Sequence, residues 1–182
     1  MSERPPQLEM ELPFLADLPP VEVADGYRLR TYHPGDEAAW CDLVNECIGG
    51  EYTEEQCRAD LTGQPWFDPA DLFFIDPARP GKEGNVVGTA CGLRRPDANT
   101  QAGYVHMLAV FPEHRGRRLG RALVLAVLHR FRELGYRSAV LQTDDWRSAA
   151  IKTYLGLGFR PRHTDASHQQ RWTEVMCRLA VK

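Results

Sequence analysis

A basic, glycine-containing turn at residues 115–120 (Arg-Gly-Arg-Arg-Leu-Gly) is the part of the chain whose residue types and spacing most favour chemistry. It follows a strand-like apolar run at residues 107–110 and leads into a long apolar segment at residues 119–134, which predicts a helix. The first turn of a helix leaves backbone N–H groups without partners, and the helix dipole favours an anion there. The turn therefore predicts a phosphate-binding site, although it matches neither a nucleotide P-loop nor a dinucleotide fingerprint.

The elements that position this turn follow from hydrophobic periodicity. Strands are expected at residues 27–32, 71–76, 85–94, 103–110 and 138–143, from residue 159 onward and at 172–181, with a hairpin turn at 77–84. Helices are expected at residues 36–48, 53–61, 119–134 and 147–157. The strand–helix–strand order over 104–143 implies a parallel pair with a right-handed crossover, and the other strands are expected to be antiparallel.

The expected architecture is a single mixed α/β domain over residues 21–182, with a central sheet of about six or seven strands flanked by helices. Residues 1–20 are rich in Pro, Glu and Leu and are expected to form a flexible or surface-draped extension.

Composition narrows the function classes. The chain has 182 residues, 43% of them hydrophobic and 26% charged, as in an ordinary water-soluble domain. Its net charge of −3 argues against a nucleic-acid or anionic-membrane partner, and no apolar run reaches membrane-spanning length. No secretory leader is recognised, so a cytoplasmic location is expected. The five cysteines form no CxxC pair, which argues against a disulfide framework and a metal site.

Two motifs together resemble those of the GNAT superfamily of N-acetyltransferases. Val110-Phe111-Pro112 precedes the turn, as in that family, and Arg115 and Gly120 match its Arg/Gln-x-x-Gly-x-Gly/Ala pattern, whereas the middle glycine is replaced by Arg118. The second motif is matched by Ala150, Tyr154, Gly158 and Phe159, with Arg147 in place of its asparagine. The resemblance covers about residues 103–160, and 147–160 is similar to mycothiol-synthase-like members, which carry two tandem domains.

The resemblance implies that acetyl-CoA is the donor and that a splayed parallel strand pair forms the acyl-CoA cleft. The turn would hold the pyrophosphate, and a bulge near Leu108 would admit the pantetheine arm and aim a backbone N–H at the thioester carbonyl. The implied cofactor-binding residues are Leu108, Ala109, Val110, Arg115, Gly116, Arg117, Arg118, Leu119, Gly120, Arg121, Arg147 and Ala150. Arg118 is compatible with the turn if its φ is negative, as in a first helical turn.

Each of these side chains also has a structural interpretation. Arg117, Arg118 and Arg121 fit a solvated helix face, and Arg115 fits a residue that ties the turn to the rest of the fold. Asp144 and Asp145 follow a predicted parallel strand, where they would cap the next helix or bind a cationic acceptor.

The catalytic residues follow partly from the resemblance. Tyr154 occupies the family's general-acid position, from which a phenol protonates the leaving thiolate; its alternative role is packing against Leu155 and Phe159. His106 is a candidate base because imidazole titrates near neutral pH. Alternative bases are Glu51, Tyr52, Glu54 and a chain of water molecules.

The expected function is transfer of an acyl group, most simply acetyl, from CoA to a small-molecule or peptide amine by direct attack on the thioester. A homodimer formed through the C-terminal strands is common in the family. The alternative is a non-catalytic acyl-CoA-binding or regulatory module on the same fold, because fold does not fix function.

Overall fold

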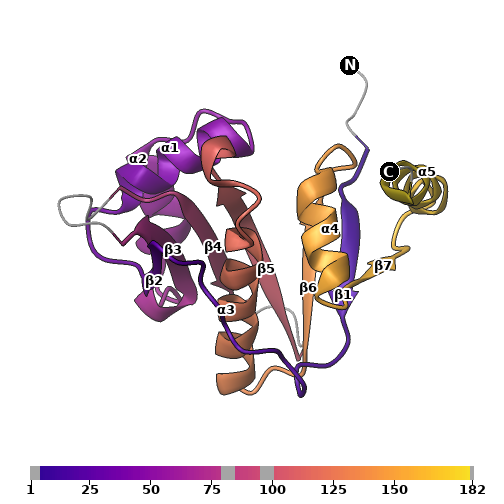
Figure 1. Ribbon diagram of the computed structural model, residues 1–182, viewed down its shortest axis with the longest axis horizontal. Coiled ribbons are helices and arrows are strands. Elements are labelled where there is room, and N and C mark those ends of the chain that lie inside the picture. Colours follow the sequence, from indigo (N-terminus) through magenta and orange to yellow (C-terminus); the bar gives the residue numbers. More distant parts are fainter. Residues whose placement is uncertain (1–4, 79–84, 95–100, 181–182) are drawn as a thin grey trace.

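The computed structural model describes residues 5–78, 85–94 and 101–180 and contains a seven-stranded sheet in the order β2-β3-β4-β5-β6-β1-β7 (Figure 1). The strands are β1 (Leu8–Leu12), β2 (Tyr27–Thr31), β3 (Leu72–Pro77), β4 (Gly88–Leu93), β5 (Ala102–Val110), β6 (Ser138–Thr143) and β7 (Arg160–Arg162). The helices are α1 (Glu37–Cys47), α2 (Glu54–Cys57), α3 (Leu119–Glu133), α4 (Ser148–Gly156) and α5 (His168–Ala180), with short turns at Arg58–Thr62, Pro69–Asp71 and Pro112–His114.

The predicted parallel pair is confirmed. β5 and β6 are parallel and are joined by α3, whereas every other neighbouring pair in the sheet is antiparallel. The predicted hairpin between β3 and β4 has the expected antiparallel pairing, and residues 79–84 of its turn lie outside the described residues. The mixed α/β class and the predicted strand number are therefore correct.

The parallel pair is joined at one end only. β5 and β6 are paired from Ala102 with Ser138 to Val105 with Leu141, and beyond that point the two strands diverge (Figure 1). The divergence coincides with an irregularity in β5, where Met107 has a φ of 51° and the register with β4 shifts between Thr89 and Cys91. A residue in this conformation bends the strand and breaks the regular ladder. The expected bulge is present, one residue before the predicted Leu108.

Alternating side chains of the central strands belong to two hydrophobic cores, one on each face of the sheet. On β3, Phe73 and Ile75 join the core beneath α3, while Leu72 and Phe74 join the core beneath α1. This explains why β3 is almost continuously apolar, because a strand with both faces covered has no solvent-facing side. Both cores include residues of β4 and β5, so these strands are packed on both faces beside the divergence.

The expectation of a flexible or surface-draped extension over residues 1–20 is wrong at Leu8–Leu12, which form strand β1. β1 lies between β6 and β7 and pairs with both, and Leu8 and Met10 are fully buried. Burial of two such side chains contributes roughly 3–6 kcal/mol of hydrophobic free energy. The period-two pattern Leu-Glu-Met-Glu-Leu already has the signature of a half-buried strand, although its acidic residues make the segment resemble a solvated one.

The C-terminal segment also differs from the expectation, because residues 172–180 belong to helix α5 and not to a strand. The buried residues His168, Trp172 and Val175 recur at helical spacing along its inner face. The strand predicted at 172–181 is therefore wrong over residues 172–180, whereas the strand predicted from residue 159 onward is present as β7, and a homodimer formed through the C-terminal strands stays a prediction. Within that part, no helix is long and apolar enough to cross a bilayer.

Candidate functional site

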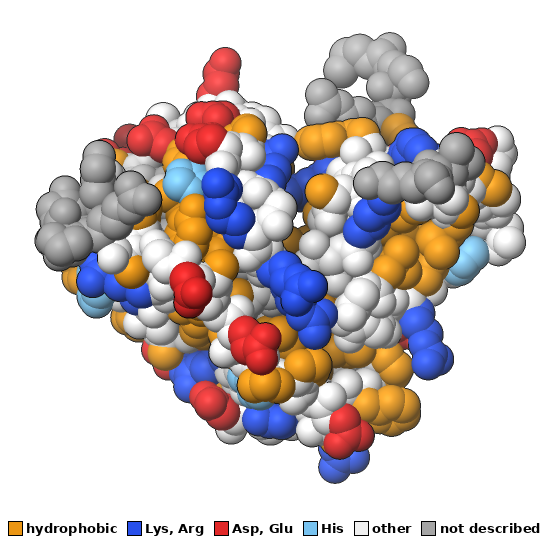
Figure 2. All heavy atoms as spheres, viewed as in Figure 1, with side chains coloured by type: hydrophobic (Ala, Val, Ile, Leu, Met, Phe, Trp, Pro, Cys, Tyr) orange, Lys and Arg blue, Asp and Glu red, His pale blue; other side chains and the backbone are white. Residues whose placement is uncertain are grey.

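A cavity of about 970 Å³ lies where β5 and β6 diverge. Figure 2 shows this face of the molecule hollowed between the two halves, with Lys and Arg side chains gathered around the hollow. The walls come from the end of β5, the turn and first residues of α3, and one face of α4 along its whole length. Eleven of the twelve predicted cofactor residues line it: Leu108, Ala109, Val110, Arg115, Gly116, Arg118, Leu119, Gly120, Arg121, Arg147 and Ala150.

The turn before α3 contains two residues with a positive φ, on either side of Arg117. Gly116 has a φ of 78°, and Arg118, at the N-cap position of α3, has a φ of 58° and a ψ of 15°. The expectation of a negative φ at Arg118 is therefore wrong. A non-glycine residue in this left-handed conformation costs roughly 1–2 kcal/mol. Such strain is typical of functional sites, because it aims backbone groups in a direction that relaxed geometry does not provide.

The N-terminus of α3 is open toward the cavity. No side chain caps it, and Leu119 and Gly120 of its first turn line the cavity. A methyl group placed on Gly120 would find its nearest neighbours 3.9 Å away, on Leu108, so the protein itself leaves room at this glycine. A 15-residue helix with an uncapped, accessible N-terminus is suited to bind an anion.

Arginines around the cavity bind backbone carbonyl groups. Arg115 donates from Nε to the carbonyl oxygen of Val110 (3.0 Å). Arg121 donates from Nη1 to that of Gly156 (3.2 Å), and Arg147 donates from Nη2 to that of Leu108 (2.8 Å). Arg121 and Arg147 therefore bridge opposite walls of the cavity. Within the described residues none of these three guanidinium groups forms an ion pair, so their positive charge remains available to an anion.

Arg117 is the predicted cofactor residue that does not line the cavity in the described structure. Its guanidinium turns back and donates from Nη1 to the carbonyl oxygen of Glu113 (2.6 Å). Both Arg117 and Arg118 were predicted to bind the cofactor. In the structure, Arg118 has a left-handed backbone and lines the cavity, whereas Arg117 does not.

Tyr154 is a core residue on α4. Its side chain is 3% exposed, and its ring lies 5.8 Å from that of Phe159. Burial raises the pKa of the Tyr154 phenol to about 12, while the positive charge of Arg147 opposes that shift. Tyr154 is not among the described residues that line the cavity, and its phenol keeps its proton at neutral pH.

His106 is half-buried on β5, and its ring lies 5.9 Å from that of Tyr104. Val105, between them, belongs to the core beneath α3, so Tyr104 and His106 are on the opposite face of the sheet. Of the alternative bases, Glu54 pairs with Arg58 (3.2 Å) and Glu51 is exposed.

Tyr52, the remaining alternative base, is held by its backbone. Its N–H donates to Asn45 Oδ1 (2.8 Å), and its carbonyl accepts from Asn45 Nδ2 (3.0 Å). Neither His106 nor any of these three alternatives is among the described residues that line the cavity.

Asp144 and Asp145 do not cap α4, which contradicts that prediction. Arg147 is the N-cap residue and provides no side-chain cap. Asp144 accepts a hydrogen bond from Gln7 (3.0 Å), and Asp145 pairs with Arg171 on α5 (3.0 Å from Nε). The hydrogen bond from Arg171 lowers the pKa of the Asp145 carboxyl group. Both carboxylates are therefore engaged on the side of α5 and β1.

Several lining residues were not predicted from the sequence. Ser148, Ala149, Lys152, Thr153 and Gly156 line the cavity together with the predicted Ala150, and their spacing of three and four residues is the signal that could have found them. Trp146, 62% exposed, lines the rim. Cys47 reaches the cavity from α1, and no sequence signal indicates this; burial raises the pKa of its thiol, against the effect of Arg115.

Comparison with known proteins shows which family this chain resembles. The model of the family described as Acetyltransferase (GNAT) family matches residues 37–159. The mycothiol acetyltransferase of Thermobispora bispora is 36% identical over 179 residues, which cover 93% of this chain and 55% of that protein. The enzyme of the same name from Nocardia farcinica is 36% identical over 83% of this chain and 51% of its own length. The chain thus spans about half the length of these curated relatives.

The solved structures lead to the same fold. A crystal structure described as a GCN5-related N-acetyltransferase from Sphaerobacter thermophilus has a TM-score of 0.71 and 26% sequence identity. It is matched over 87% of this chain and 50% of that chain.

Proposed function

The chain belongs to the acetyltransferase (GNAT) family, and we propose that it transfers an acetyl group from acetyl-CoA to a primary amine. The observation that carries this proposal is the cavity between the diverging β5 and β6, which joins a helix N-terminus to an apolar passage. One elongated ligand with a phosphate end and a slender arm matches both parts. Acetyl-CoA is such a ligand.

The phosphate end of the donor fits the turn before α3. Backbone N–H groups of Leu119 and Gly120, together with Arg115 and Arg118, would surround the pyrophosphate. The pantetheine arm would follow Leu108, Ala109 and Val110, whose backbone is released from β6 by the divergence. An arm with amide groups can pair with such a free strand edge as a neighbouring strand would.

The chemical step is direct attack of a neutral amine on the thioester carbonyl. We assign His106 as the base that takes the proton from the incoming ammonium group, since it lies on β5 two residues before Leu108. Tyr154 is assigned as the final proton donor to the CoA sulfur. The acceptor would approach from the face of the sheet that carries His106, opposite α3.

The acceptor is proposed to be an amine on a small molecule. The support is that the matched relatives are named for acetylation of one small molecule, mycothiol. Because this chain spans about half of their length, the acceptor itself is to be found by screening small-molecule amines, with peptide amines as the comparison.

Calorimetric titration with acetyl-CoA tests the donor site. The wild-type protein is expected to bind acetyl-CoA, and Gly120→Ala is expected to weaken binding at least tenfold, because the added methyl group occupies the space of the pyrophosphate. Gly156→Ala, on the opposite wall and likewise without a steric neighbour in the protein, is the matched control and is expected to change affinity less than threefold. Failure of the folded wild-type protein to bind acetyl-CoA would overturn the proposal.

The catalytic assignment is tested by Tyr154→Phe, once an acceptor amine is known. Turnover is expected to fall by at least tenfold while the affinity for acetyl-CoA changes little, because the hydroxyl group is removed and the ring remains. His106→Gln is expected to remove the acidic limb of the pH profile of kcat/KM. Acetyl-CoA binding without transfer to any amine would instead support the non-catalytic module.

A further inference from the structure

We infer that Arg147 is a catalytic cation whose guanidinium stabilises the CoA thiolate as that group leaves the tetrahedral intermediate. This inference rests on the proposed function, because it concerns the step in which CoA departs. It goes beyond the cofactor contact predicted for Arg147, since it assigns the side chain to the reacting sulfur and not to the phosphates.

The position of Arg147 is the first support. Its guanidinium reaches from the N-cap of α4 to the carbonyl oxygen of Leu108 (2.8 Å), across the space where β5 and β6 have separated. β5 runs toward the phosphate turn, so Leu108 is the lining residue of that strand that lies farthest from it. A donor with its phosphates at α3 therefore has its thioester near Leu108, beside the guanidinium.

The charge of Arg147 is the second support. The two carboxylates that precede it are occupied elsewhere, Asp144 by Gln7 and Asp145 by Arg171. No ion pair of Arg147 occurs within the described residues. Among these residues, one hydrogen bond of the guanidinium is present, the bond to Leu108, out of the five N–H groups that an arginine carries. The group can therefore keep its place and still donate to sulfur.

The reaction requires such a cation. The amine lone pair forms the new C–N bond, and the C–S bond then breaks with its electron pair going to sulfur. The nitrogen loses one proton to the base, and the sulfur finally gains one. Tyr154, whose pKa burial raises to about 12, is a weaker acid than an alkyl thiol, so its proton reaches sulfur only after the C–S bond has broken. A fixed positive charge lets sulfur leave as the thiolate before it is protonated.

Other charged groups near the cavity must be separated from this effect. The titratable residues that share the cavity with Arg147 are Glu22, Cys47, His114, Arg115, Arg118, Arg121 and Lys152. Tyr154 faces the guanidinium from α4, and Asp144 and Asp145 precede it. All of these groups act on CoA and on acetyl-CoA alike, except through the free thiol. The ratio of the affinity for CoA to the affinity for acetyl-CoA therefore reports the ionisation of the CoA thiol alone.

The test measures the dissociation constants of CoA and of acetyl-CoA by calorimetry from pH 6.5 to 9.5, with no acceptor present. An opposite charge within about 4–6 Å lowers a pKa by roughly 1–3 units. A bound thiol with a lowered pKa binds more tightly once it ionises. In the wild-type protein the affinity of CoA relative to acetyl-CoA is therefore expected to rise at least tenfold across this range.

Three variants separate the possible roles. Arg147→Lys keeps the charge and is expected to keep most of the rise. Arg147→Met removes the charge and is expected to reduce the rise to twofold or less. Arg121→Met, which removes a different bridging arginine from the same cavity, is expected to leave the ratio as in the wild-type protein. Circular dichroism confirms that each variant is folded.

The contrary outcomes are distinct. A flat ratio in the wild-type protein, with both ligands bound, overturns the inference and leaves the proposed function intact. Equal weakening of both ligands by Arg147→Met at every pH, with the rise unchanged, makes Arg147 a phosphate ligand and also overturns it. Absence of acetyl-CoA binding overturns the proposed function and this inference together.

Discussion

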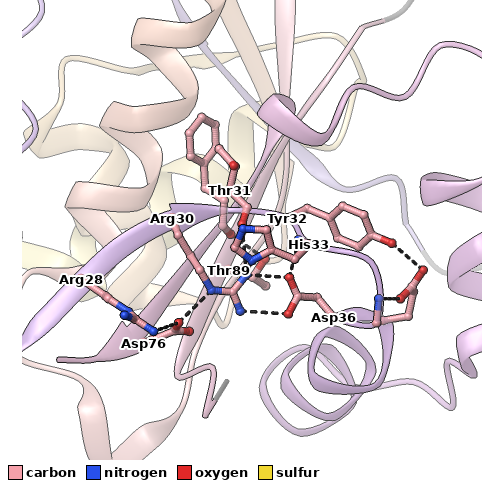
Figure 3. A network of polar contacts seen from close by, with 11 residues as sticks. Arg28, Arg30, Thr31, Tyr32, His33, Asp36, Asp76 and Thr89 are labelled. Carbon is pink, nitrogen blue, oxygen red and sulfur yellow. Dashed lines mark hydrogen bonds and ion pairs between the residues drawn. The ribbon is translucent and has the colours of Figure 1, made fainter. Parts of the chain in front are cut away.

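The arginines of the β2–α1 region and those of the cavity are used in opposite ways. On β2, Arg30 donates to both oxygens of Asp36 (2.6 and 2.9 Å) and to Asp76 (2.8 Å), which is fully buried (Figure 3). Arg28 reaches the same Asp76 carboxylate (3.5 Å). Every charge in this cluster has a partner of opposite sign, and the cluster ties β2 to β3 and to the start of α1.

The cavity arginines have carbonyl oxygens as partners and, within the described residues, no carboxylates. Carbonyl groups position Arg115, Arg121 and Arg147 without neutralising them. The difference shows that hydrogen bonding alone does not distinguish a structural arginine from a binding one. The distinguishing property is whether the charge is already compensated, because an uncompensated cation in a cavity attracts an anionic ligand.

The largest expected effect of this difference is on stability. Arg30→Met removes the closer of the two arginines that pair with the buried Asp76 and is expected to lower the free energy of unfolding by about 3–5 kcal/mol, because only Arg28, 3.5 Å away, then compensates that buried charge. Urea denaturation measures this loss. The affinity for acetyl-CoA of the protein that remains folded is expected to be unchanged, and a loss of affinity without a loss of stability would contradict the comparison.

A charge reversal in the cavity is expected to do the opposite. Arg118→Glu places a carboxylate beside the proposed pyrophosphate site and is expected to weaken acetyl-CoA binding at least tenfold, with a change in unfolding free energy of less than about 1 kcal/mol. Arg117→Glu is the matched control, because Arg117 is adjacent to Arg118 in the sequence but is not among the described residues that line the cavity. Equal effects of the two variants would mean that net charge, and not position, determines binding.

Acid should weaken the paired cluster selectively. Burial alone would raise the pKa of Asp36, but the hydrogen bond from Arg30 and the backbone bond from His33 outweigh it and hold that pKa below its usual value. The stability that this interaction contributes is present above the unfolded-state pKa, near 4, and is lost as the pH falls through the lower folded-state value. Urea midpoints between pH 5 and 2.5 are expected to fall less steeply in Arg30→Met than in the wild-type protein.

The cavity was largely predictable because its signals are local. The turn at 115–120 and the α4 motif each lie within one short stretch, and the helix that joins the two strands brings them together. The sequence could not indicate that β1 fills the slot between β6 and β7, because strand pairing over more than a hundred residues leaves no local trace. The contact of Arg147 with Leu108 could not be predicted either, because it depends on how far β5 and β6 diverge.

The wrong prediction for α5 has a different cause. Trp172, Val175 and Leu179 include residues that favour strands, but their spacing of three and four residues places them on one helix face. At Arg118 the prediction of a negative φ follows from placing the residue within the first helical turn, whereas the structure places it at the N-cap position with a left-handed backbone.

The smallest expected effect concerns this strain. Arg118→Gly accepts the φ of 58° without a Cβ and is expected to raise the free energy of unfolding by about 1 kcal/mol, measured by urea denaturation, even though a charged side chain is lost. Gly116→Ala, at a φ of 78° and with no atom within 4 Å of the added methyl group, isolates the same backbone term and is expected to destabilise the protein by about 1 kcal/mol. If Arg118→Gly destabilises the protein, the Arg118 side chain contributes to the fold, and the separation between compensated structural arginines and uncompensated cavity arginines does not extend to this residue. If it stabilises the protein and weakens acetyl-CoA binding, the strained backbone at Arg118 costs stability but places the side chain that binds the ligand.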